Sequence, residues 1–160
     1  MTIRKRNILD KIGAKIPGYT GYSDRSDTRK IEKELRSQSA RLLEMSEEKI
    51  IAYQKTLITR NDLNSVRDWE LIRKQINTFI SKIRNANYGE SSFFSADQIK
   101  EEELRQILSF DEQIADKSQV IFNLIEHELQ FDLAPTVVSN LLKEVDAILF
   151  SRAKFINNYK

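Results

Sequence analysis

The sequence predicts an all-α protein: an antiparallel up-down four-helix bundle preceded by a short basic helix. Apolar residues recur at gaps of three, four and seven, which places them on one face of a helix. Only 4 Gly and 2 Pro occur in 160 residues, so long helices meet few interruptions. No segment alternates apolar and polar residues as a half-buried strand does. Short connections between the expected helices favour the up-down order.

The chain divides into a leading segment, residues 1–23, and a helical bundle, residues 24–160. Residues 3–15 predict a short basic helix with a narrow apolar stripe. The stripe contains Ile8, Ile12 and Ile16. We expect this helix to end before Pro17, because proline disfavours the α conformation in the residue that precedes it.

The bundle is predicted to contain four long helices, over residues 27–60, 64–86, 97–129 and 135–156. In the first, the expected inward residues are Ile31, Leu35, Leu42, Met45, Ala52, Tyr53 and Leu57. A restart of that helix is possible at Ser46, which has the side chain of a helix cap. In the second they are Val66, Trp69, Ile72, Ile76, Phe79, Ile80 and Ile83. The other two carry similar stripes, and Pro135 suits the first turn of the last helix.

Two short segments rich in glycine and aromatic residues interrupt the helices, at residues 16–22 and 87–96. In an up-down bundle both segments lie at the same end, so they form a candidate surface for a protein partner or a second copy. The candidate contact residues are Pro17, Gly18, Tyr19, Gly21, Tyr22, Tyr88, Gly89, Phe93 and Phe94. The alternative is that these aromatic side chains form a small satellite core that closes the end of the bundle.

The leading segment also suggests an anionic surface as a partner. Its candidate residues are Arg4, Lys5, Arg6, Lys11 and Lys15. A basic amphipathic helix of this kind binds anionic membranes; alternatively, it packs on the bundle through Ile8 and Ile12. Basic residues continue to Arg41, but Glu32 and Glu34 interrupt them, so nucleic-acid binding is the less favoured form of this alternative. The net charge of +2 is divided unevenly, with the excess of basic residues before residue 80.

The sequence offers little for catalysis, and we expect a non-enzymatic protein without a cofactor or a metal. It has no cysteine and a single histidine, His127, so thiolate sites and two-histidine metal sites are excluded. No phosphate-binding glycine loop or nucleophile motif occurs. No apolar run is long enough to span a membrane, and the N-terminus lacks the pattern of a secretory signal, so we expect a cytoplasmic protein.

Residues 16–36 and 84–111 resemble a group of small uncharacterised bacterial helical proteins. The likeness rests on Ile-Pro-Gly-Tyr-Thr-Gly-Tyr at 16–22, on the following charged segment ending in Leu35-Arg36, and on a second patch. That patch comprises Ala86-Asn87-Tyr88-Gly89, Phe93-Phe94, Glu103-Leu104 and Phe110-Asp111. The resemblance implies a prokaryotic, cytoplasmic protein, and it implies no activity, cofactor or catalytic residue. Thr28 departs from the group's pattern, which has a basic residue there.

Overall fold

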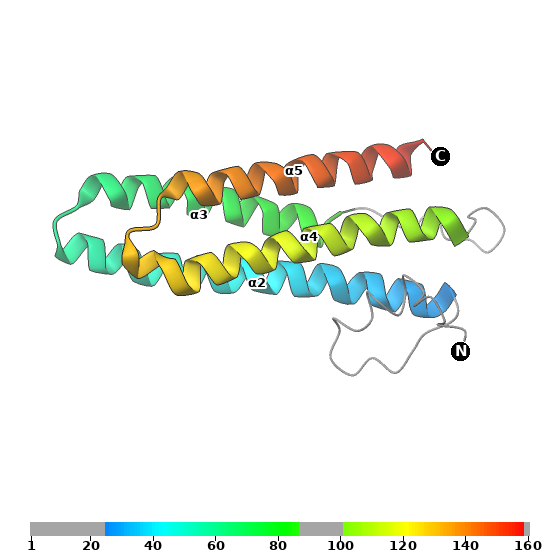
Figure 1. Ribbon diagram of the computed structural model, residues 1–160, viewed down its shortest axis with the longest axis horizontal. Helices are drawn as coiled ribbons and strands as arrows, with labels where there is room; N and C mark the ends of the chain where they lie inside the picture. Colours follow the sequence, from blue (N-terminus) through cyan, green and yellow to red (C-terminus); the bar gives the residue numbers. More distant parts are fainter. Residues whose placement is uncertain (1–24, 87–100, 159–160) are drawn as a thin grey trace, which may run out of the picture.

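The computed structural model describes residues 25–86 and 101–158, and these residues form an all-helical bundle (Figure 1). The helices are α2 (Arg25–Thr59), α3 (Leu63–Arg84), α4 (Glu101–Glu128) and α5 (Pro135–Asn157), with a 3-10 turn, η2 (Leu129–Phe131), after α4. The prediction of an all-α bundle with four long helices is therefore confirmed. None of the described helices is long and apolar enough to cross a membrane.

The four helices surround a common core. α2 packs against α3 and α4, and α5 packs against the same two helices from the other side. Figure 1 shows the chain turning back between α2 and α3, and again between α4 and α5. The core contains mainly branched aliphatic residues, with Trp69 of α3 placed against Tyr53 of α2 edge to face, at 6.2 Å between ring centroids.

The connection between α2 and α3 is a tight turn with conventional chemistry. Asn61 has a φ of 59°, in the left-handed region that asparagine tolerates better than most residues. Asp62 then caps α3 by accepting a hydrogen bond from the backbone N–H of Ser65. The second connection has a similar left-handed residue, Asp132, and Pro135 occupies the first turn of α5 as the sequence predicts.

The inward residues predicted for α2 are correct near both ends of the helix and wrong in its middle. Met45 and Ala52 are exposed, whereas Leu43 and Ile50 are completely buried. The buried face passes through Ser46, whose hydroxyl donates to the carbonyl of Leu42 at 2.7 Å. Because this hydroxyl is satisfied within the helix, α2 continues through Ser46 without the restart that the sequence suggested.

α3 is shorter than its neighbours and ends well inside the bundle. Its last residues lie beside Arg36, which follows the start of α2 by eleven residues, or roughly 16 Å along the helix axis. Beyond this point α2, α4 and α5 continue without α3, and α4 and α5 share a second apolar cluster of Leu104, Ile107 and Ile156. We call this the Arg25 end of the bundle, and the opposite end the Asp62 end.

Candidate functional site

The residues that the sequence marks for partner binding all lie outside the described residues. They are Pro17, Gly18, Tyr19, Gly21, Tyr22, Tyr88, Gly89, Phe93 and Phe94, and the same holds for Arg4, Lys5, Arg6, Lys11 and Lys15. What the structure does give is the helix ends to which these segments connect. α2 and α4 both begin at the Arg25 end, and α3 ends on the side facing it (Figure 1).

A group of four charged residues lies where α3 ends; three of them are buried, and the fourth, Arg36, is half-buried. We call it the ionic cluster: Glu32 and Arg36 of α2, Asp111 of α4 and Arg152 of α5. Nε of Arg152 donates to Oδ1 of Asp111 at 2.8 Å, and its Nη2 lies 3.9 Å from Oε1 of Glu32. Nε of Arg36 donates to the same Glu32 oxygen at 2.8 Å. The cluster thus joins three helices through charged side chains that are buried or half-buried.

Arg36 also binds the C-terminal end of α3. Its Nη1 donates to the carbonyl of Ala86 at 3.1 Å and to that of Arg84 at 3.4 Å. The last carbonyls of a helix have no partner within the helix and carry partial negative charge, so a guanidinium stabilises them. The position at which the chain leaves α3 toward residues 87–100 is therefore fixed by a side chain of α2.

Burial changes the protonation of both carboxyl groups in the cluster. The pKa of Glu32 is raised to about 8, mainly because its carboxyl is removed from water and also because the Asp111 carboxylate repels its charge. Arg36 and Arg152 act in the opposite direction without overcoming the desolvation. The pKa of Asp111 is raised as well, again by burial, with Arg152 opposing the increase. A protonated Glu32 at neutral pH leaves two guanidinium groups and one carboxylate in the cluster.

Two hollows adjoin the ionic cluster. A cavity of about 10 Å³ touches Arg36, Ser39, Asp111 and Arg152, and has room for a single water molecule. Oδ2 of Asp111, which is buried, accepts no hydrogen bond from the described residues. Arg152 also lines an open groove of about 990 Å³ between the end of α3 and the second half of α5.

The chemistry of the cluster is structural in character. Asp111 and Glu32 each bind a guanidinium, and this use of their oxygens competes with any metal ion. No group of three or more His, Cys, Asp or Glu side chains in residues 25–86 and 101–158 is arranged to hold a metal. The side chain of His127 is 72% exposed at the far end of α4. The arrangement is suited to aligning helices and fixing helix ends.

Sequence reasoning missed this cluster, although the sequence contained a signal for it. Asp111 follows the buried Leu104 by seven residues, and Arg152 follows the buried Val145 by seven. Seven residues are two helical turns, so both charged residues occupy positions of the apolar stripe. A charged residue at such a position predicts a partner across the core, and the two residues have opposite charges.

Comparisons with known proteins add no family to this description. No protein-family model, no curated protein and no solved structure matches the chain. The functional inference therefore depends on the fold, the ionic cluster and the candidate segments of the sequence.

Proposed function

We propose that the chain is a non-enzymatic helical scaffold of the bacterial cytoplasm that binds a protein partner or a second copy through residues 16–22 and 87–94. The proposal takes the bundle as antiparallel and up-down, with residues 3–15 as a basic helix. One observation carries it: the segment before α2 and the segment between α3 and α4 connect to helix ends on one side of the bundle. The proposal expects the two segments tethered there to form one surface.

The ionic cluster supports this proposal because it fixes the end of α3, which carries one of the segments, and aligns α5 with α4. Arg36 binds the last carbonyls of α3, and Arg152 ties α5 to α4 through Asp111. Binding costs less when a contact surface is attached to a rigid support, because fewer conformations are lost on association. A scaffold of rigid helices that presents two short segments fits this requirement.

The test replaces three aromatic residues, Tyr19, Tyr22 and Phe94, by alanine in one variant. Proteins retained by the immobilised wild-type chain are identified by mass spectrometry and then purified for a direct binding measurement. The proposal expects the purified partner, or a second copy, to bind the variant at least about tenfold more weakly, with the melting temperature unchanged. F131A is the matched control, because Phe131 is 72% exposed and lies at the opposite end. A lower melting temperature with unchanged binding would instead show that the aromatic residues close the bundle end.

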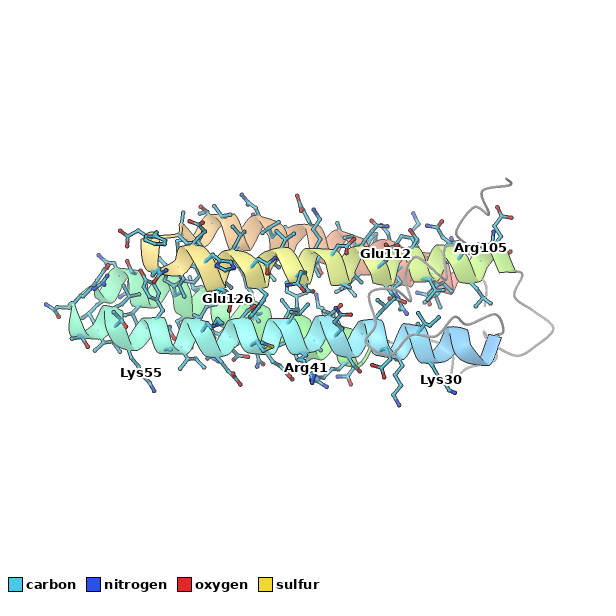
Figure 2. The ribbon with its side chains drawn as sticks, turned by 60° about the horizontal axis from the view of Figure 1, so that its bottom comes forward. Lys30, Arg41, Lys55, Arg105, Glu112 and Glu126 are labelled. Carbon is cyan, nitrogen blue, oxygen red and sulfur yellow. The ribbon has the colours of Figure 1, made fainter. Side chains whose placement is uncertain are left out.

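The alternative is a peripheral protein that binds anionic membranes or nucleic acid through its basic leading segment. Lys30, Lys33 and Arg41 extend the basic region along the exposed side of α2, and Figure 2 shows Lys30 and Arg41 pointing outward. Arg36 does not contribute to this surface, because it turns inward to Glu32. Sedimentation with phosphatidylserine vesicles and with DNA at 50 and 200 mM salt tests this reading, since electrostatic binding weakens steeply over that range.

A further inference from the structure

The groove between α3 and α5 contains an unusually exposed aromatic side chain. Phe150 is 70% exposed, although it sits in the second half of a helix whose other face is buried in the core. It lies on the wall of the groove of about 990 Å³, together with Ala147, Ala153 and Asp146. The groove exists because α3 ends near Arg36 whereas α5 continues past it.

The residues around Phe150 form a pattern that is symmetric along α5. Residues three, four and seven positions away share a helix face with it. At three positions on either side stand two small residues, Ala147 and Ala153. At four positions stand opposite charges, Asp146 before it and Lys154 after it, each about 6 Å away along the axis.

This pattern is self-complementary under a two-fold axis. If two α5 helices pack antiparallel with the axis at Phe150, each residue faces the one equally far on the other side in the partner. Each Asp146 then faces the Lys154 of the second copy, and each Ala147 faces an Ala153. The small residues let the two helices approach closely around the paired phenylalanine rings, and no like charges are opposed at these positions.

We propose that the Phe150 face of α5 binds a second copy of this chain in an isologous, antiparallel pair. The face is defined by Asp146, Ala147, Phe150, Ala153 and Lys154. Oδ1 of Asp146 accepts a hydrogen bond from Nζ of Lys82 at 3.1 Å. The other carboxylate oxygen is left for the Lys154 ammonium of the second copy. This surface lies on α5 and shares no residue with the segments assigned to partner binding above.

The charges identify the occupant as a second copy. A helix of another protein would need only an apolar residue opposite Phe150. A second copy matches the phenylalanine, both alanines and both charged residues at the same time. Lys154 forms no ion pair among the described residues, and the proposed pair supplies one in each half of the interface. Two reciprocal charge pairs fix the antiparallel direction, because a parallel arrangement places like charges opposite one another.

The experiment is sedimentation equilibrium of the full chain at concentrations up to about 100 μM, well above the Kd of a micromolar dimer. We expect the wild type to form a dimer and F150A to raise the dimer Kd at least about tenfold, as loss of a central aromatic contact does. F131A, with a similar exposure at the Asp62 end, should leave the Kd unchanged. Circular dichroism verifies that each variant is folded.

An exchange of the charges at residues 146 and 154 tests the predicted pairing directly. D146K and K154D each place like charges together and should weaken the dimer, whereas the double variant D146K/K154D restores opposite charges and should recover it. A monomeric wild type at about 100 μM, or a dimer that survives in F150A, overturns the proposal. The dimer Kd measured here does not depend on the outcome of the partner-binding test with Y19A, Y22A and F94A. The two proposals can therefore fail independently.

Discussion

Nε of Arg152 donates to Oδ1 of Asp111 at 2.8 Å, and both residues are only 2% exposed. The bond joins the last quarter of α5 to the first half of α4 at the level where α3 ends. A buried ion pair contributes little net stability, because the removal of two charges from water offsets their attraction. Its structural effect is one of alignment, since only one relative position of α4 and α5 pairs the two charges.

Removal of Arg152 alone should be costly. R152M leaves the Asp111 carboxylate buried without its cation, and we expect the free energy of unfolding at pH 8 to fall by about 3–5 kcal/mol. K117M removes the exposed pair between Lys117 and Glu144 and should cost less than about 1 kcal/mol. Urea unfolding followed by circular dichroism measures both. The double variant D111L/R152M should recover most of the loss; equal losses in the single and double variants would argue against a paired charge.

The stability of the protein should fall as the pH rises from about 5 to 8.5. The pKa of Glu32 is about 8 in the folded chain against 4.5 as its ordinary value, so the folded state keeps a proton that the unfolded chain releases. Its contribution is therefore complete below pH 4.5 and is lost as the pH rises through 8. Asp111, whose pKa is also raised, acts in the same direction at the acidic side of this range.

Urea unfolding at pH 5 and pH 8.5 measures this slope. We expect a decrease of at least about 1.4 kcal/mol, the equivalent of one pKa unit. E32Q should flatten the slope and be more stable than the wild type at pH 8.5, because an amide is uncharged throughout. E34Q, which changes an exposed carboxyl two residues away on the same helix, should keep the wild-type slope. The interpretation fails if E32Q retains the full slope.

Arg36 should control the end of α3. R36M removes the donors to the carbonyls of Arg84 and Ala86, and a hydrogen bond from a charged group contributes about 1.5–3 kcal/mol. We expect backbone amides of residues 80–84 to exchange with solvent at least about tenfold faster, as a loss of that size implies. Hydrogen exchange measured by NMR gives this result residue by residue. R41M, which changes an outward-pointing arginine of α2 (Figure 2), should leave these amides as they are.

The sequence predicted all four long helices, but it predicted their buried faces correctly only where those faces are apolar. All the inward residues expected for α3, from Trp69 to Ile83, are buried, apart from the half-buried Val66. In α2 the buried face includes the polar residues Ser46 and Gln54. The apolar pattern therefore predicted the exposed Met45 as an inward residue instead. The ionic cluster was missed for the same reason. A charge in the core is tolerated only with its partner, and the partner of Arg152 lies on another helix, 41 residues away.

The corrected face of α2 leads to a direct test on two adjacent isoleucines. Ile50 is completely buried and Ile51 is 39% exposed, so identical substitutions should differ strongly. I50A removes buried methyl groups and leaves a cavity, and should lower the free energy of unfolding by about 2–5 kcal/mol. I51A should change it by less than about 0.5 kcal/mol, as is usual for exposed positions. Both values come from urea unfolding with an unchanged dependence on denaturant. A loss in I50A as small as that in I51A would contradict the buried path through Ser46.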